Sequence, residues 1–259
     1  MMRGCLSAAL LLIYSLGNAE GSDGLYLYQI SVEGAESFEL DDGPLIVSLE
    51  IEDRAILADS LAQTSVKIHN EDDRGLRVTL HGNDTFIDKP DTPLTHSSWV
   101  MDFDEAPVQG LLEALWEATS DDLINPDFIT QYTYDVIVDK NYMNGFNIAS
   151  QVANSLEGDC TEHAVLNAAL VRANGFQARV VMGLLILVRN EEVQVFGHAW
   201  NEILESDAWR VHDATRPKSD PAVQRVFYLP LTKLENEGPG YAMSVIEFAL
   251  RRPTALSFN

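Results

Sequence analysis

One segment in the second half of the chain constrains the fold most strongly. Asp159 is a good N-cap, and Glu162 three residues later completes a capping-box pattern. The residues that follow form helices well, and Gly175 stands where a C-cap glycine belongs. Shortly after it, Val180–Val188 is apolar except for one glycine, and it is too short to span a bilayer. The segment therefore predicts a capped helix followed by a buried strand.

The predicted helix begins with a cysteine. The backbone N–H groups and the macrodipole at a helix start favour negative charge, so we expect the pKa of the Cys160 thiol to fall. The nearby carboxylates of Asp159 and Glu162 oppose that change. A base elsewhere in the chain must therefore help to activate this thiol.

The first nineteen residues have the pattern of a secretory signal. Arg3 supplies a positive charge, Leu6–Leu12 begins an apolar run, and small residues follow up to Ala19. The alternative is an uncleaved anchor helix, but the run is shorter than the roughly 20 residues that a membrane span needs. Cleavage after Ala19 removes Cys5 and leaves Cys160 as the only cysteine. The predicted location is periplasmic or secreted.

The charge balance limits the partners. The 259 residues include 40 acidic and 17 basic side chains, for a net charge of −23. Nucleic acid and anionic membrane surfaces would be repelled, so we expect neither as a partner. The charge is typical of a soluble protein, and it could also steer cationic substrates. Two cysteines cannot form a disulfide framework or a four-thiolate zinc site.

The candidate base lies on a predicted hairpin that also carries a carboxylate. His198 belongs to one predicted strand and Asp213 to the other. A two-residue turn at Ser206–Asp207 places the two side chains diagonally on one face, and a turn one residue earlier places them directly opposite. Either arrangement brings the side chains within about 5–8 Å. A three-residue loop would put them on opposite faces.

These residues together predict nucleophilic catalysis. Cys160 would attack a carbonyl as a thiolate, His198 would take the thiol proton and later protonate the leaving amine, and Asp213 would hold the imidazole. The Cys160 N–H is a plausible oxyanion donor. Gln151 or Trp200 is a candidate for a second donor.

Three blocks of sequence resemble the transglutaminase-like superfamily. They are Gly158–Gly183 around the cysteine, Gly197–Ile203 around the histidine and Trp209–Thr215 around the aspartate, in the family's order and spacing. The resemblance covers residues 128 to 216. It implies an α+β fold with a papain-like core, in which the nucleophile helix packs on an antiparallel sheet, and a Cys160–His198–Asp213 triad. Family members cleave amides or transfer acyl groups from glutamine to amines.

The rest of the chain is divided by pattern. We predict a signal peptide at 1–19, a small β-rich domain at 20–105 and a catalytic domain at 106–259. In the β-rich part, strands are expected within residues 25–32, 65–69 and 76–80. Helices are expected around 108–116, from 126 towards 140, within 146–156 and within 241–250. The N-terminal β region shows no chemical motif.

The predicted function is a peptidase or amidase that forms a thioester acyl-enzyme on a peptide or protein substrate. The alternatives are a protein-glutamine transamidase with the same mechanism and a non-catalytic binding module. A zinc site of Cys160 and His163 with His198 or His212 is a further alternative, but the usual second ligand pair is missing. We expect no cofactor and no metal, including calcium. His163 and His212 are interpreted as structural, and the oligomeric state stays open.

Overall fold

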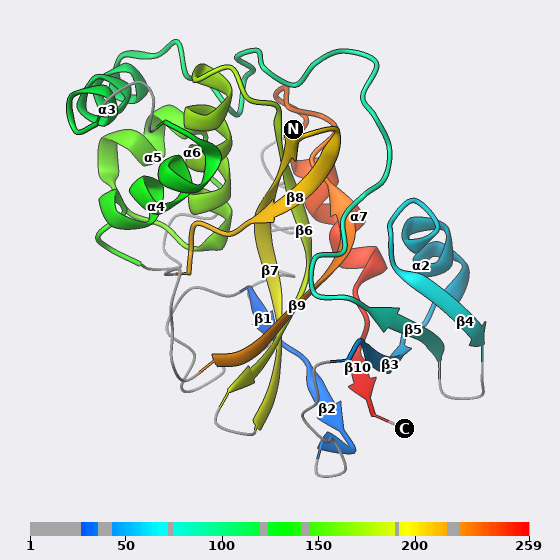
Figure 1. The fold of residues 1–259 in the computed structure, drawn as a ribbon. Helices are drawn as coiled ribbons and strands as arrows, with labels where there is room; N and C mark the ends of the chain where they lie inside the picture. The colour runs from blue at the N-terminus through cyan, green and yellow to red at the C-terminus, as the bar shows by residue number, and fades with distance from the viewer. Residues whose placement is uncertain are drawn as a thin grey trace, which may run out of the picture.

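The computed structural model describes residues 27–35, 43–71, 75–119, 124–140, 146–189, 192–216 and 223–258. The predicted signal peptide and Cys5 lie outside the described residues. Within the described residues, no helix is long and apolar enough to cross a membrane. Figure 1 shows two sheets with helices against them.

The first sheet carries the predicted hairpin. Its strands follow the order β1 (Tyr28–Gln29), β7 (Glu192–Glu205), β6 (Ala178–Arg189) and β9 (Val223–Lys233), and β8 (Ala208–His212) also pairs with β7. All these pairs are antiparallel. Because β6 occupies one edge of β7, β1 and β8 lie along the other edge.

The second sheet joins the two ends of the described chain. Its order is β2 (Ser31–Glu33), β10 (Ala255–Ser257), β3 (Leu45–Glu50), β5 (Leu76–Leu80) and β4 (Lys67–Glu71). β10 comes from the C-terminal end, runs parallel to β2 and antiparallel to β3. Each sheet therefore contains strands from before and after residue 105, where the sequence predicts the boundary between the β-rich and catalytic domains. That boundary stays a prediction.

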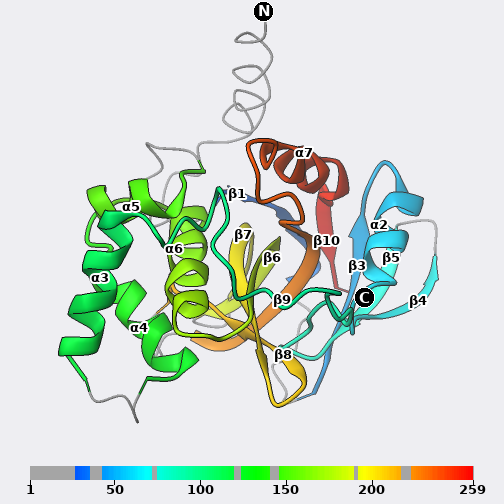
Figure 2. The ribbon, with the colours of Figure 1, turned by 90° about the horizontal axis from the view of Figure 1, so that it is seen from above.

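Four helices gather on one side of the first sheet (Figure 2). They are α3 (Ala106–Glu117), α4 (Pro126–Val136), α5 (Ala149–Ser155) and α6 (Cys160–Ala173). Helices α2 (Arg54–Leu61) and α7 (Ala242–Arg251) contact β9 and each other. The α6 helix is buried along its length, which identifies it as the central helix.

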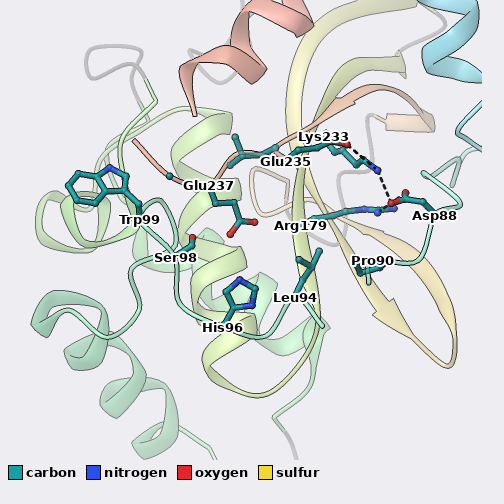
Figure 3. Close-up of a pocket in the computed structure, with 12 residues that line it drawn as sticks. Asp88, Pro90, Leu94, His96, Ser98, Trp99, Arg179, Lys233, Glu235 and Glu237 are labelled. Atoms are coloured by element: carbon teal, nitrogen blue, oxygen red, sulfur yellow. Dashed lines mark hydrogen bonds and ion pairs between the residues drawn. The ribbon is translucent and has the colours of Figure 1, made fainter. Parts of the chain in front are cut away.

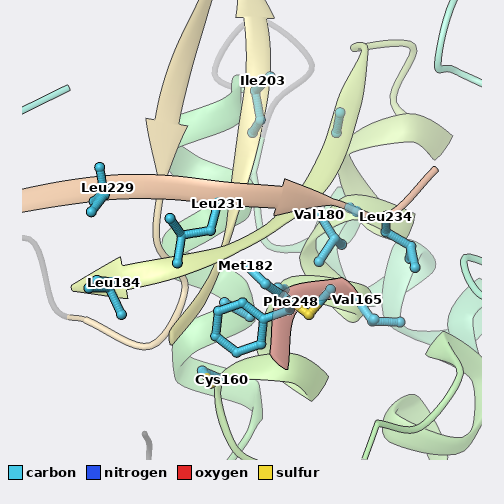
Figure 4. Packing of buried hydrophobic residues seen from close by; sticks show 14 of the residues in the cluster. Cys160, Val165, Val180, Met182, Leu184, Ile203, Leu229, Leu231, Leu234 and Phe248 are labelled. Carbon is cyan, nitrogen blue, oxygen red and sulfur yellow. The ribbon is translucent and has the colours of Figure 1, made fainter. Parts of the chain in front are cut away.

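The hydrophobic core covers both faces of the first sheet, because the side chains of β6 are buried on each face. Met182, Leu184 and Ile186 point into the larger hydrophobic cluster, which also contains Cys160 (Figure 4). Val181 and Leu185, whose side chains alternate with these, belong to a smaller cluster with Trp200 and Tyr228. The continuous apolar run in the sequence therefore reflects a strand covered on both sides.

The expected α+β fold, with a helix packed on an antiparallel sheet, is confirmed. The capping box at Asp159 and the N-cap at Asn125 are present as predicted. Helix α2 was not predicted from the sequence. Asp53 caps it through hydrogen bonds from the Ala55 and Ile56 N–H groups, a short-range signal that was present in the sequence.

Candidate active site

Cys160 is the first residue of α6, and its side chain is fully buried. The capping box fixes this helix start, since Asp159 accepts a hydrogen bond from Thr161 N–H at 2.8 Å and Glu162 accepts one from Asp159 N–H at 3.1 Å. Glu162 also accepts a hydrogen bond from Asn147 N–H at 2.8 Å. The position of the thiol is therefore set by its own helix and by the segment that precedes α5.

Gly158 is required by close packing at this point. A Cβ atom at this residue would lie 2.2 Å from Cβ of Glu162, which is far inside van der Waals contact. The absence of a side chain at Gly158 allows the Glu162 carboxylate to fold back over the helix start.

His198 and Asp213 are hydrogen-bonded. Nε2 of His198 lies 2.9 Å from Oδ2 of Asp213, and both side chains are almost completely buried. The register is the diagonal one that a turn at Ser206–Asp207 predicts, with Glu205 opposite Ala208. The β7–β8 ladder ends at the pair Asn201–His212, so Asp213 follows directly after the last paired residue.

Two further residues hold the Asp213 carboxylate. Thr215 donates to Oδ1 from its backbone N–H at 3.0 Å and from its hydroxyl at 2.5 Å. Tyr228 on β9 donates its hydroxyl to Oδ2 at 2.9 Å. Burial acts to raise the pKa of Asp213, but the charge and hydrogen bond of His198, the Thr215 hydroxyl and the charge of Arg216 hold it well below its ordinary value. Asp213 is thus ionised at neutral pH.

The thiol reaches β7 beside His198. The N–H of Ala199, the residue after His198, interacts with the Cys160 sulfur. On this edge of β7, the ladder with β1 covers Phe196 and Gly197 and the ladder with β8 begins at Asn201. Cys160 therefore approaches the short stretch between the two ladders.

The pKa of the Cys160 thiol is raised well above its ordinary value. Burial is the largest cause, the negative charges of Asp159, Glu162 and Asp213 add to it, and the Ala199 N–H opposes it. The expectation that the helix start lowers this pKa is therefore wrong for the closed site. The favourable helix position does not compensate for the loss of water around a buried thiolate.

Tyr28 lies next to these groups. It pairs with Gly197, and its ring rests on that glycine so closely that a Cβ atom there would lie 2.2 Å from the Tyr28 ring. The hydroxyl is buried and has no hydrogen-bond partner among the residues that the structure describes. Burial raises the pKa of Tyr28 well above its ordinary value; the charge of Arg252 opposes this and that of Cys160 adds to it.

The other candidates take different places. Gln151 is exposed on α5. The Trp200 ring stacks on His198 at 6.3 Å between centroids, and its indole N–H has no partner in the described part of the chain. His163 is fully buried with Nδ1 2.6 Å from the Asp159 carbonyl, and burial lowers its pKa to about 4. His212 lies 2.6 Å from Glu205.

The three site residues that sequence reasoning missed are Tyr28, Thr215 and Tyr228. Thr215 could have been found, because a hydroxyl two residues after an aspartate is a common local partner for its carboxylate. Tyr28 and Tyr228 have no such local signal, since each reaches the site from a distant strand. In the described ranges, no group of three or more His, Cys, Asp or Glu side chains is arranged to hold a metal ion.

Two cavities were compared with the positions of Cys160, His198 and Asp213. The larger cavity, of about 500 Å³, is lined by none of these three residues. Its lining includes Arg179 and Lys233, both of which pair with Asp88 (Figure 3). The smaller one, about 300 Å³, is bordered by Asp213 and Tyr228. We therefore associate the smaller cavity with the candidate active site.

Residues 122–214 match the family model described as the transglutaminase-like superfamily. This segment is a transglutaminase-like domain. The domain includes α4, α5, α6, β6, β7 and β8, and it contains Cys160, His198 and Asp213. Their catalytic roles stay a prediction.

Solved structures give more distant likenesses to the chain that carries this transglutaminase-like domain. A candidate cysteine protease from Cytophaga hutchinsonii has 14% identity and a TM-score of 0.42, with 84% of this chain and 81% of that chain covered. A TGase has 15% identity and a TM-score of 0.35, with 75% of this chain and 57% of that chain covered. No curated protein matches the chain in sequence.

Proposed function

We propose that this chain is a cysteine enzyme that acts on amide bonds through Cys160, His198 and Asp213, with peptide or protein as substrate. The observation that carries the proposal is the hydrogen bond of an ionised Asp213 to Nε2 of His198, beside a thiol that touches the next residue of β7. A buried carboxylate in this position stabilises the imidazolium that forms when His198 takes a proton.

The raised thiol pKa makes His198 the necessary base. With Nε2 bound to Asp213, Nδ1 is the ring nitrogen that exchanges protons with thiol and substrate. As the sulfur forms a bond to the amide carbon, its proton passes to His198. The C–N bond then breaks, and the imidazolium gives that proton to the leaving amine, which leaves a thioester on Cys160.

The second half of the reaction restores the thiol. His198 removes a proton from water as the water oxygen attacks the thioester carbon. The C–S bond then breaks, the acyl group is released as a carboxylic acid, and the imidazolium returns its proton to the Cys160 sulfur. If a primary amine attacks in place of water, the product is a new amide. Hydrolysis is the primary proposal, and transamidation is the alternative by the same acyl-enzyme.

In this mechanism, two groups stabilise the negative charge that forms on the carbonyl oxygen of the substrate amide. One is the Cys160 backbone N–H at the start of α6. For the second we propose the Tyr28 hydroxyl, because it is buried, unpartnered among the described residues and electrostatically coupled to Cys160. Trp200, whose buried indole N–H also has no partner among the described residues, stays the alternative donor.

One observation favours the non-catalytic alternative. Cys160 is completely buried in this structure, so a substrate needs a local opening to reach it. A binding module would keep such a thiol covered and unreactive. A mechanism-based test is therefore needed to separate the two functions.

The experiment is incubation with a peptide library, with and without a labelled primary amine. New peptide termini indicate a peptidase, loss of an amide as ammonia an amidase, and label incorporation a transamidase. Cys160→Ala is the control for all three, and full activity in that variant would exclude the proposed mechanism. No reaction with the wild-type chain, even after a search over peptides, would favour the binding module.

We also propose that the chain acts in the periplasm or outside the cell, based on the N-terminal signal pattern. Export followed by removal of residues 1–19 predicts a mature chain that begins at Glu20. Intact mass measurement of the protein recovered from each cell fraction tests this. A full-length chain confined to the cytoplasm would contradict it.

A further inference from the structure

A buried pair of amide side chains joins the helix of Cys160 to the strand of His198. Asn201 on β7 donates a hydrogen bond from Nδ2 to the Ala164 carbonyl of α6 at 2.8 Å. Its Oδ1 accepts a hydrogen bond from Nδ2 of Asn167, which is also on α6, at 2.8 Å. Both asparagines are completely buried. A single side chain of the strand is therefore bonded to the helix twice.

These hydrogen bonds lie about one helical turn from the thiol. Ala164 follows Cys160 by four residues, which is about 6 Å along a helix. Asn201 follows Ala199 by two residues, which is about 6.7 Å along a strand. The Ala199 N–H interacts with the Cys160 sulfur, so the matching spacings let α6 contact β7 at both points at once. The bonds of Asn201 therefore set the register in which the thiol meets the strand.

Apolar packing around these bonds does not set such a register. Ala168 on α6 and Ala199 and Ile203 on β7 belong to the larger hydrophobic cluster. Apolar contacts are non-directional, so they allow a helix to shift slightly along a strand. Hydrogen bonds depend on both distance and angle. Because reacting groups must be held within about 0.5 Å of their productive geometry, directional bonds are the means of placing a sulfur beside an imidazole.

The same network reaches the strand that precedes Asp213. Nδ2 of Asn167 also donates to the Thr130 hydroxyl on α4 at 3.3 Å. That hydroxyl lies 3.4 Å from Nδ1 of His212, the last residue of β8. His212 stands opposite Asn201 in the β7–β8 ladder. The network thus links the elements that hold all three residues of the candidate triad, and Asn201 is the member on the central strand.

We infer that Asn201 is a positioning residue that holds α6 against β7 at the register in which the Cys160 thiol lies beside His198. The inference rests on the proposed function and adds a residue that acts through others, without contact with the reacting atoms. Loss of its bonds leaves the three reacting side chains present but lets the sulfur and the imidazole move out of line.

The test measures how strongly His198 assists the thiol. Iodoacetamide alkylation of Cys160 is followed by mass spectrometry in the wild type, His198→Ala, Asn201→Ala and the double variant. In the wild-type background, we expect His198→Ala to slow alkylation about tenfold. In the Asn201→Ala background, the same change should alter the rate by less than about twofold, since the imidazole no longer meets the sulfur.

Two further variants separate position from stability, because a thiol exposed by unfolding also reacts independently of His198. Thr133→Val removes the buried hydroxyl on α4 that donates to Oδ1 of Asn167 at 3.1 Å, but it leaves both Asn201 bonds. This variant should keep the wild-type dependence on His198. Asn167→Leu combined with Asn201→Leu fills a similar volume with apolar groups, which leaves the melting temperature nearly unchanged, yet the dependence should still be lost.

Thermal unfolding of every variant restricts the comparison to folded proteins, and either form of the Asn201 change is sufficient if the other does not fold. Where a peptide is cleaved by the wild type, Asn201→Ala should lower kcat by about 100-fold with KM nearly unchanged. The separation of kcat from KM is a second effect that a general loss of stability does not produce.

The outcomes distinguish the inference from the proposed function. An unchanged dependence on His198 in the Asn201 variants, or its loss in Thr133→Val as well, overturns the inference, and continued peptide cleavage then leaves the proposed function intact. Loss of the dependence in the Asn201 variants alone, with no peptide cleaved by the wild type, contradicts only the proposed function. A wild-type thiol that reacts equally well without His198 overturns both.

Discussion

Oδ2 of Asp213 lies 2.9 Å from Nε2 of His198, although the ladder between their strands ends one residue before Asp213. Because Asp213 is outside the ladder, its carboxylate depends on side-chain contacts for its orientation. Thr215 supplies two of these contacts and Tyr228 a third. The geometry of the pair is thus decided by residues that do not themselves exchange protons.

Removal of the Tyr228 hydroxyl should weaken this arrangement. We expect Tyr228→Phe to lower the free energy of unfolding by about 1–2 kcal/mol, since Asp213 loses one hydrogen bond in a buried place. A less firmly held His198 should also lower kcat by about tenfold, with little change in KM. Chemical denaturation and steady-state kinetics measure the two effects. Tyr241→Phe, which loses a hydrogen bond to the Phe146 carbonyl, is the control and should affect stability alone.

The Tyr28 hydroxyl is expected to act in the transition state. Tyr28→Phe should lower kcat by about 100-fold with KM nearly unchanged, which is typical of the loss of an oxyanion donor. Tyr132→Phe, whose hydroxyl bonds the Leu111 carbonyl, should have near wild-type kinetics. A faster Tyr28→Phe enzyme would mean that this hydroxyl restrains the thiol, contrary to the proposed role.

The reactivity of Cys160 should depend on pH in the direction that its raised pKa requires. A group with a raised pKa has little thiolate at neutral pH, so alkylation by iodoacetamide should be slow below pH 8 and should accelerate up to alkaline pH. His198→Ala should slow the reaction further, and His96→Ala should not. Fast alkylation with a plateau below pH 7 would indicate a preformed thiolate and would contradict this expectation.

Buried His163 should destabilise the chain in mild acid. Its pKa is about 4 in the folded state against 6.5 for the free group, so the unfolded state binds the proton first as pH falls. The resulting loss of stability begins near pH 6.5, ends near pH 4 and reaches about 3 kcal/mol.

His163→Gln removes that dependence while its amide N–H can still donate to the Asp159 carbonyl. Urea unfolding at several pH values should show the wild type losing more stability than the variant between pH 7 and pH 4. Glu202, whose pKa burial raises to about 7, acts in the opposite sense but is common to both chains. Parallel stability curves for the two chains would refute the assignment to His163.

The close approach at Gly158 can be tested directly. Gly158→Ala places a Cβ atom 2.2 Å from Glu162 Cβ, so the capping box must shift and the helix start should lose about 1–3 kcal/mol. Gly110→Ala, in α3, meets no atom within 4 Å and should be neutral or stabilising by up to about 1 kcal/mol. Thermal unfolding of both variants checks this. Equal melting temperatures for Gly158→Ala and Gly110→Ala would show that the close contact with Glu162 does not affect stability.

The sequence by itself determined the local features of this protein. The capping box at Asp159 and the N-cap at Asn125 were readable because each depends on hydrogen bonds between residues within a few positions. For the hairpin, the sequence left three turns open, and the structure selects the turn at Ser206–Asp207, which puts His198 and Asp213 diagonally on one side of the strands. The three family blocks located the candidate triad, although its catalytic roles still depend on experiment.

Only the tertiary structure decided the surroundings of that site. The raised pKa of Cys160 follows from burial by distant segments, which no local pattern expresses. Tyr28 and Tyr228 reach the site from β1 and β9, and β10 completes a sheet that begins near the other end of the described chain. Such contacts join residues far apart in sequence, and they form only when several strands pack together. For that reason the sequence predicted the reacting groups, while the fold determined how they are covered, charged and held.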